Sequence, residues 1–151
     1  MNRKELKSLN QDQFLMFGQK IGQKLKGGEV FELISDLGGG KTTLTKSIVK
    51  GAKSSDQVSS PSFTICNEYK ALKFTIYHFD FYRLSDPGII NLELKEILES
   101  KQNPVVIIEW PESVLNILPK DHIKIKITIV GESLRDIDLS YPDKFKYLLE
   151  D

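Results

Sequence analysis

The eight residues from 35 to 42, with the sequence SDLGGGKT, carry the residue types that bind phosphate groups. They match the pattern G-x-x-x-x-G-K-[ST] at every position except the first, which is Ser35. Backbone N–H groups can point inward around a phosphate only where side chains are absent, and three consecutive glycines meet this condition. In such loops the lysine reaches the β and γ phosphates, and the hydroxyl of the next residue binds Mg²⁺. The segment predicts a nucleotide-binding site made by Gly38, Gly39, Gly40, Lys41, Thr42 and Thr43.

Two acidic residues follow apolar runs and are suited to work beside a bound nucleotide. Glu109 ends the run 105–108, which is typical of a strand that leads to a metal-binding acid. We therefore predict that Glu109 and Thr42 bind Mg²⁺, with Glu109 acting directly or through water. Asp80 ends a second run, and the sequence leaves open which acid positions the attacking water. Lys41, Asp80 and Glu109 are the predicted catalytic residues.

The elements on either side of the glycine loop are those that a phosphate loop requires. Residues 30–34, VFELI, form a short apolar run typical of a strand covered on both faces. After the loop, Leu44 and Ile48 recur at helical spacing, and Gly51 stands where a left-handed helix cap is expected. Strand, loop and helix therefore follow one another in the expected order. Ser35 should have an ordinary strand-end conformation, because a positive φ would strain it.

The remaining segments predict the rest of the fold. Asn10 and Gln13 predict a capping box at the start of a helix that ends near residues 27–28. Residues 74–80 alternate so that Ile76, His78 and Asp80 share one face. A strand over 63–69 is expected to form a hairpin with 74–80. A helix over 89–99 and strands over 105–109 and 122–129 follow, and a segment over 135–139 is expected to pair with the strand over 122–129. The last predicted element is a short surface helix over 143–151. We predict an α/β fold of the phosphate-loop type, with a mixed sheet flanked by helices in one small domain spanning residues 1–151.

Length and composition exclude several classes of protein. The chain has 151 residues, 40% of them hydrophobic and 28% charged, which predicts one globular domain rather than a disordered chain. Lys plus Arg and Asp plus Glu are both 21, so no global positive field would attract nucleic acid. The single cysteine cannot form an intrachain disulfide, and no apolar run approaches the roughly 18 residues of a spanning helix. These features predict a cytoplasmic protein without membrane segments.

Several chemically active residue types are more simply interpreted as structural. His78 is a lone strand histidine, so the sequence assigns it no chemistry. Cys66 and Trp110 are interpreted as packing residues. The lysines that alternate with isoleucines over 122–129 are interpreted as a solvated face, and a tRNA or partner contact is the alternative.

The sequence also resembles the TsaE (YjeE) family of bacterial ATPases over nearly its whole length. The resemblance rests on the glycine loop extended to Thr43 and on four strings: SPSF at 60–63, HFDFYRL at 78–84, IEWPE at 108–112 and LP at 118–119. The loop alone would indicate only a very large superfamily. The other strings, at these separations, are specific to one family.

The resemblance implies a phosphate-loop protein that binds ATP and Mg²⁺ and hydrolyses ATP slowly. It implies that this activity supports threonylcarbamoyladenosine (t6A) modification of adenosine 37 in tRNA. The implied partners are the TsaB and TsaD proteins, with tRNA reached indirectly through their complex. The threonylcarbamoyl transfer itself would take place on the partners.

The resemblance also implies roles for individual residues. In the family, the residues at the positions of Thr42 and Glu109 hold Mg²⁺. The residue at the position of Asp80 is needed for hydrolysis, and the one at the position of Arg135 contacts the nucleotide. Ser60 and Ser62 fall in a switch-like loop, whose usual Ser-Pro-Thr becomes Ser-Pro-Ser with the hydroxyl retained.

The start of the first helix departs from the family pattern. The family usually has a threonine where Phe14 stands, so the sequence leaves the nucleotide contacts of residues 10–13 open.

Other functions of a phosphate loop remain as alternatives. A small-molecule kinase uses the same loop, but such kinases commonly bring several arginines to the phosphate, and this chain has three in all. A GTP-driven switch normally carries an N-K-x-D motif, which the sequence lacks. A nucleotide-binding interaction module without catalysis is the remaining alternative.

Overall fold

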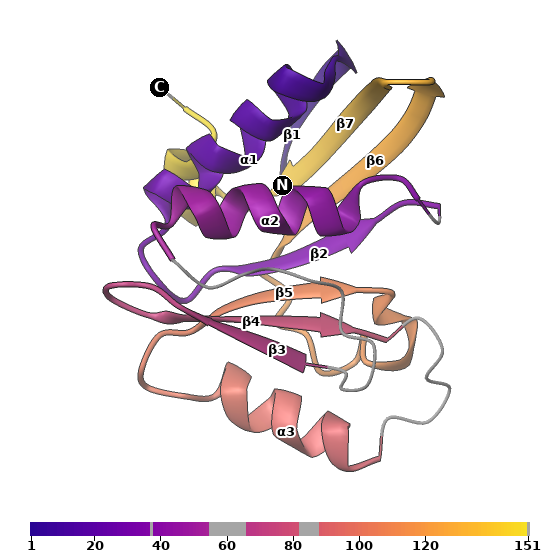
Figure 1. Cartoon of the computed structure of the whole chain (residues 1–151). Helices are drawn as coiled ribbons and strands as arrows, with labels where there is room; N and C mark the ends of the chain where they lie inside the picture. Colours follow the sequence, from indigo (N-terminus) through magenta and orange to yellow (C-terminus); the bar gives the residue numbers. More distant parts are fainter. Residues whose placement is uncertain (37, 55–65, 82–87, 151) are drawn as a thin grey trace.

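The computed structural model describes residues 1–36, 38–54, 66–81 and 88–150. Within these ranges the chain forms a seven-stranded sheet with the order β1-β7-β6-β2-β5-β4-β3 (Figure 1). The inner strands β6, β2, β5 and β4 are parallel, and antiparallel strands complete both edges. This mixed sheet with flanking helices confirms the predicted fold class.

The predicted elements occur in the predicted order, and β1 and η1 are additional. Along the chain they are β1 (Asn2–Leu9), α1 (Gln11–Lys24), β2 (Val30–Ile34), α2 (Lys41–Gly51), β3 (Cys66–Lys70), β4 (Thr75–Asp80), α3 (Ile89–Leu98), β5 (Val105–Glu109), the 3-10 helix η1 (Pro111–Ser113), β6 (Ile123–Gly131), β7 (Leu134–Tyr141) and the 3-10 helix η2 (Asp143–Leu148). The predicted hairpin is confirmed by the antiparallel pairing of β3 and β4, although residues 63–65 lie outside the described part of the chain.

Two apolar cores lie on opposite faces of the sheet. On β5, Val105 and Ile107 belong to the core beneath α1 and α2, whereas Val106 and Ile108 belong to a second core that includes Leu94 of α3. Figure 1 shows α1 and α2 on one side of the sheet and α3 at the other. The unbroken apolar sequence of β5 is explained by this burial of both faces. In the described ranges no helix is both long and apolar enough to span a membrane.

The start of α1 is set by local hydrogen bonds, as predicted. The side chain of Asn10 accepts a hydrogen bond from the backbone N–H of Gln13 at 2.9 Å. In return the Gln13 side chain accepts one from the backbone N–H of Asn10 at 2.8 Å. This capping box fixes where α1 begins, and therefore which of its residues face the glycine loop.

Three glycines allow α1 and α2 to pack closely. A Cβ atom at Gly22 of α1 would lie 2.0 Å from the carbonyl oxygen of Ile48, and one at Gly51 of α2 would lie 2.1 Å from that of Gln19. A Cβ atom at Gly18 would lie 2.5 Å from the Cβ atom of Ser47. The prediction of a left-handed cap at Gly51 was wrong, because Gly51 is the last residue of α2 and has no positive φ. The glycine is required by the neighbouring helix instead.

The first strand was not predicted from the sequence. β1 pairs antiparallel with β7, and only Leu6 and Leu9 in it are apolar. On the other face of β1, salt bridges join the strand to β7. Arg3 lies 2.8 Å from Asp138, and Lys7 lies 3.5 Å from Asp136. A strand with this composition covers the edge of β7 without offering an apolar edge of its own.

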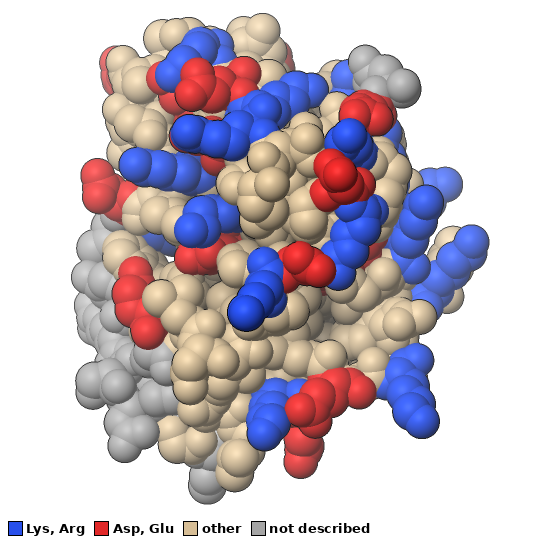
Figure 2. Space-filling model, turned by 180° about the vertical axis from the view of Figure 1, so that it is seen from behind, with Lys and Arg blue, Asp and Glu red and all other residues tan. Residues whose placement is uncertain are grey.

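One of the β6 lysines that alternate with isoleucines also takes part in ion pairing on the sheet surface. Lys124 lies opposite Glu32 of β2 in the sheet register, with 3.9 Å between the charged atoms. Figure 2 shows basic and acidic side chains interspersed over the side of the molecule opposite to that in Figure 1. This mixture supports the interpretation of a solvated, ion-paired face.

The C-terminal segment is more buried than the sequence indicated. Residues 143–148 form η2, in which Phe145 and Leu148 are buried in the core shared with α1. The hydroxyl of Tyr147 donates a hydrogen bond to Glu29 at 2.5 Å, and Glu29 is itself fully buried. The predicted surface helix is therefore a packed 3-10 helix that closes one end of the core.

Candidate functional site

The glycine loop has the backbone that a phosphate cradle needs. Gly38 and Gly40 have φ values of 76° and 113°, in the left-handed region that favours glycine. A Cβ atom at Gly39 would lie 2.4 Å from the Ser35 hydroxyl oxygen, so this position has no room for a side chain. Ser35 has no positive φ, which confirms its predicted ordinary conformation. Ser35 can therefore stand where the pattern has glycine.

Lys41 lies buried at the first turn of α2. Its Nζ atom is 3.2 Å from the carbonyl oxygen of Ser35 and 4.0 Å from the centre of the Trp110 ring. Burial lowers the pKa of Lys41, and the carboxylates of Glu109 and Asp80 oppose that shift. The lysine is thus held by a carbonyl dipole and an aromatic face, both of which an incoming anion can replace.

The two predicted acids lie side by side at the ends of neighbouring strands. Asp80 of β4 and Glu109 of β5 are register partners, and Leu33 of β2 is the partner of Glu109 on the other side. Glu109 is 3% exposed, whereas Asp80 is half-buried. Strand alternation places both acids on the α2 side of the sheet, because Ile76 and Ile107 belong to the core on that side. The acids therefore face the same side as Lys41.

His78 is a site residue to which the sequence assigned no chemistry. It is fully buried, and its Nε2 atom is hydrogen-bonded to a carboxylate oxygen of Glu109. The two residues are diagonal neighbours, since His78 lies opposite Ile107 in the register. A histidine two residues before one acid, on a strand beside the other acid, was the signal available in the sequence. It becomes informative only once β4 and β5 are known to be neighbours.

Trp110 also has more than a packing role. It follows Glu109 with φ 55° and ψ 61°, a left-handed conformation that costs a bulky residue free energy. This conformation puts its ring beside the Lys41 ammonium. Cys66 fits its predicted packing role, because burial raises the pKa of its thiol to about 12 and leaves it protonated.

Arg135 of β7 contacts the backbone of the glycine loop. Its Nε atom donates a hydrogen bond to the carbonyl oxygen of Gly39 at 3.0 Å, and Nη1 donates to Leu134 at 2.9 Å. Beside it lies a cavity of about 240 Å³ between the start of α1, the glycine loop and the β6–β7 turn. Residues that line this cavity include Asn10, Gln11, Gly40, Thr43 and Arg135.

Phe14 is in contact range of the glycine loop. A Cβ atom at Gly40 would lie 3.2 Å from the Phe14 ring, so the phenylalanine occupies the space beside the start of α2. The departure at Phe14 thus places an aromatic ring against the loop backbone. Of residues 10–13, whose nucleotide contacts the sequence leaves open, Asn10 and Gln11 line the cavity.

Of the remaining predicted site residues, Thr42 and Thr43 lie within the described part of the chain. Thr42 is half-buried and Thr43 is exposed, and both lie in the first turn of α2. Ser60 and Ser62, the predicted switch loop, lie outside the described residues.

The residues present fit a nucleotide and Mg²⁺. The loop leaves open space beside Gly38 and has a buried cation at Lys41, as a phosphate chain requires. In the described ranges, no three His, Cys, Asp or Glu side chains converge as a metal site. Mg²⁺ commonly takes only one or two carboxylates and completes its shell with water and phosphate oxygens. A hydroxyl and a single carboxylate, as in the predicted pair Thr42 and Glu109, are compatible with that sparse donor set.

Comparisons with known proteins agree with this geometry. Residues 8–137 match the family described as threonylcarbamoyl adenosine biosynthesis protein TsaE. The chain is 36% identical over 136 residues to the tRNA threonylcarbamoyladenosine biosynthesis protein TsaE of Haemophilus influenzae, covering 85% of this chain and 84% of that protein. It is 34% identical over 128 residues to the protein of the same name from a Nostoc strain, covering 83% and 78%.

A solved structure has the same fold. The crystal structure of Bacillus subtilis YdiB superposes with a TM-score of 0.77 at 26% identity, covering 97% of this chain and 91% of that one. The family match spans the glycine loop, both acids and Arg135. The chain therefore belongs to the TsaE family, which has a role in the threonylcarbamoyladenosine modification of tRNA.

Proposed function

We propose that the protein is a Mg²⁺-dependent ATPase that supports t6A modification of adenosine 37 in tRNA together with TsaB and TsaD. The observation that carries this proposal is the convergence of the glycine loop, the buried Lys41 and the paired strand-end acids Asp80 and Glu109 on one side of the sheet. Family membership supports the pathway. The whole chain is proposed to act as one ATPase domain in the cytoplasm, where tRNA is modified.

Binding of the phosphate chain is assigned to the loop and the start of α2. The N–H groups of Gly38, Gly39 and Gly40, with the N-terminal end of the α2 dipole, would cradle the phosphates. Lys41 would exchange its carbonyl and aromatic contacts for phosphate oxygens. Arg135 would hold the loop through Gly39 while its guanidinium stays beside the cavity, where Thr43 also lies.

The acids are proposed to hold the metal and position water. Thr42 and Glu109 would bind Mg²⁺, which neutralises phosphate charge when bound. Asp80 is half-buried beside Glu109 and is suited to orient the attacking water. Ser60 and Ser62 are proposed to form a switch that reads the γ phosphate.

Turnover without partners is proposed to be slow. Of the arginines in the described ranges, Arg3 is paired with Asp138 on β7, and Arg135 donates to backbone carbonyls. Neither is positioned as an arginine finger, the group that accelerates phosphoryl transfer by about 10³- to 10⁵-fold in other enzymes. The TsaB–TsaD pair is expected to raise the rate.

The test is Mg²⁺-dependent ATP hydrolysis by the purified protein, alone and with the TsaB–TsaD pair. Lys41→Ala should abolish hydrolysis, whereas Lys46→Ala, an exposed lysine on the same helix, should leave it unchanged. We expect a clear rise on adding the partners. A fast rate that ignores the partners would contradict the proposal, and a phosphorylated small-molecule acceptor would favour the kinase alternative.

A further inference from the structure

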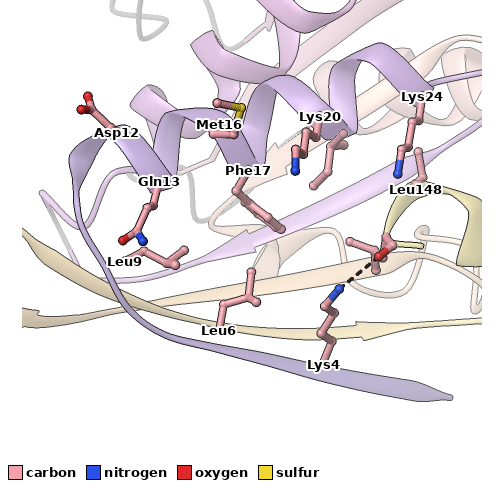
Figure 3. A pocket seen from close by; sticks show the side chains of 12 residues that line it. Lys4, Leu6, Leu9, Asp12, Gln13, Met16, Phe17, Lys20, Lys24 and Leu148 are labelled. Atoms are coloured by element: carbon pink, nitrogen blue, oxygen red, sulfur yellow. Dashed lines mark hydrogen bonds between the residues drawn. The ribbon is translucent and has the colours of Figure 1, made fainter. Parts of the chain in front are cut away.

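A groove of about 390 Å³ lies outside the proposed ATP site, between α1, β1 and the end of η2 (Figure 3). Phe17 points from α1 toward Leu6 on β1, and Ile21 and Leu148 continue the apolar lining. Met16 adds an apolar side chain that is 53% exposed. The described fold leaves this apolar surface accessible, which is a common property of docking sites.

Three lysines stand along this groove. Lys20 and Lys24 extend from successive turns of α1, and Lys4 extends from β1 on the other wall (Figure 3). Lys4 donates to the carbonyl oxygen of Leu149 at 3.0 Å, and Lys24 donates to that of Glu150 at 2.6 Å. Carbonyl oxygens are neutral, so these contacts orient the ammonium groups without cancelling their charge.

The three lysines keep their positive charge available to a partner. No ion pair joins any of them to a carboxylate within the described ranges, in contrast to the paired Arg3 and Lys7 on the other face of β1. Asp12 lies at the opposite end of the groove from Lys24. The lining at this end of the groove therefore carries lysines without an acidic lining residue, a distribution that suits carboxylates of a partner.

The α1 wall of the groove is long enough to seat a helix. From Asp12 to Lys24 the wall formed by α1 is about 18 Å long at 1.5 Å per residue, or about three helical turns. An amphipathic helix of that length can place apolar side chains on the lining while Asp or Glu residues beside them meet the lysines. A small ligand would use the apolar lining but would not engage lysines on both walls along this length.

The groove adjoins the nucleotide cavity through the start of α1. Leu9 lines both of them, and the residues after it divide between the two, with Asn10 and Gln11 facing the cavity and Asp12 and Gln13 facing the groove. A helix seated in the groove would therefore press on the same turn of α1 that borders the glycine loop.

We propose that this groove docks an amphipathic helix with acidic flanks, presented by the TsaB–TsaD pair. The proposal rests on the proposed function, because that function supplies the partner. The docked helix buries Met16 and the apolar lining, and its carboxylates pair with Lys4, Lys20 and Lys24. Docking thereby couples the partner to the nucleotide cavity through the first turn of α1.

The experiment compares two charge reversals of the same kind. Lys20→Glu/Lys24→Glu reverses two groove lysines four residues apart on α1. Lys46→Glu/Lys50→Glu makes the same change on exposed residues of α2 with the same spacing. Binding of the purified TsaB–TsaD pair to each full chain is measured by calorimetry with ATP and Mg²⁺. Nucleotide affinity and Tm of each variant alone confirm that its fold and ATP site are intact.

We expect the groove reversal to weaken binding of the pair at least tenfold, and the α2 reversal to change it less than twofold. Met16→Glu should weaken binding by a similar factor, with Leu72→Glu on an 88% exposed residue as its control. Equal binding by the groove variants and their controls would overturn the proposal while leaving the proposed function intact. Failure of the unmodified protein to bind the pair would overturn both.

The identity of the occupant is tested by a photoreactive phenylalanine analogue placed at position 16. After irradiation with the TsaB–TsaD pair, mass spectrometry identifies the attached segment. A helix with apolar residues at three- and four-residue spacing and flanking acids is expected. Attachment to a basic or extended segment, or to no segment of a pair that binds, would contradict the proposal.

Discussion

At the scale of single residues, His78 makes a direct side-chain contact with Glu109 of the proposed metal site. Both side chains are buried, and the imidazole Nε2 is hydrogen-bonded to the carboxylate. Such a hydrogen bond restrains the orientation of the carboxylate, as residues that hydrogen-bond to metal ligands commonly do. We therefore predict that His78 positions Glu109.

Replacing His78 should impair the use of Mg²⁺ more than the binding of nucleotide. We expect His78→Ala to lower Mg²⁺-dependent ATP hydrolysis by about 10- to 100-fold, the usual effect of losing such a partner. The Mg²⁺ concentration for half-maximal rate should rise, and His78→Gln, whose amide N–H can reach the position of Nε2, should recover part of the loss. His122→Gln is the control. An unchanged Mg²⁺ requirement in His78→Ala would count against this role.

The other histidine makes stability depend on pH. The ring of His122 lies 2.8 Å from a Glu32 carboxylate oxygen and 2.7 Å from the carbonyl oxygen of Pro119. Both partners accept hydrogen bonds, so the doubly protonated ring suits the site. The hydrogen bond to Glu32 raises the pKa of His122 above its ordinary 6.5, and the Pro119 carbonyl adds to the shift against the effect of burial.

This shift predicts a direction for the pH dependence. Because the pKa is higher in the folded state, the stabilisation is complete below pH 6.5 and is lost as the pH rises through the folded-state pKa. The free energy of unfolding in urea, measured from about pH 5 to about pH 9, should exceed that of His122→Gln most at low pH. A difference between the two proteins that stays constant over this range would refute the assignment.

At the scale of elements, the close contact of α1 and α2 decides how the glycine loop is supported. We expect Gly22→Ala to destabilise the fold by about 1–3 kcal/mol, since its Cβ would meet the Ile48 carbonyl oxygen at 2.0 Å. By helix propensity alone, alanine in place of glycine would stabilise the helix by about 1 kcal/mol. The sign of the change in the free energy of unfolding therefore shows whether packing or propensity dominates. Urea unfolding measures the effect, with exposed Gln23→Ala as the control. A stabilised Gly22→Ala would mean that the helices can separate at little cost.

Local signals made much of the fold predictable. The capping box of Asn10 and Gln13, the apolar run of β5 and the glycine loop are each specified by residues close in sequence. Three features depend on distant residues and escaped prediction. β1 is a strand because β7 lies beside it, Gly51 is needed because Gln19 lies against it, and η2 is buried because α1 covers it.

The candidate site divides in the same way. The loop and the two strand-end acids follow from residue types and spacing, since each ends an apolar run. The roles of His78 and Trp110 depend on which strands are neighbours and on one left-handed residue, and neither is encoded in a short motif.

At the scale of the whole molecule, the proposed nucleotide cavity joins elements from opposite ends of the sequence. Its walls come from α1, the loop before α2 and the β6–β7 turn, and Arg135 of β7 is hydrogen-bonded to Gly39. A ligand bound there should stabilise the entire fold rather than a single loop.

The expected size of this stabilisation follows from mass action. ATP with Mg²⁺ at about 100 times its Kd should raise the free energy of unfolding by about 2.7 kcal/mol. Calorimetric melting should show the shift for the unmodified protein and for Lys46→Ala, and a much smaller one for Lys41→Ala. Equal shifts for the two variants would place the phosphates away from the glycine loop.

The position of Trp110 has a practical consequence for optical spectroscopy. It is the single tryptophan of the chain, and its ring lies 4.0 Å from the Lys41 ammonium. Indole emission responds to nearby charge, so a phosphate that draws Lys41 away should change the intensity or wavelength of the intrinsic fluorescence. The unlabelled protein therefore carries its own fluorophore beside the phosphate cradle, and a simple titration can compare nucleotide affinity across every variant that retains Trp110.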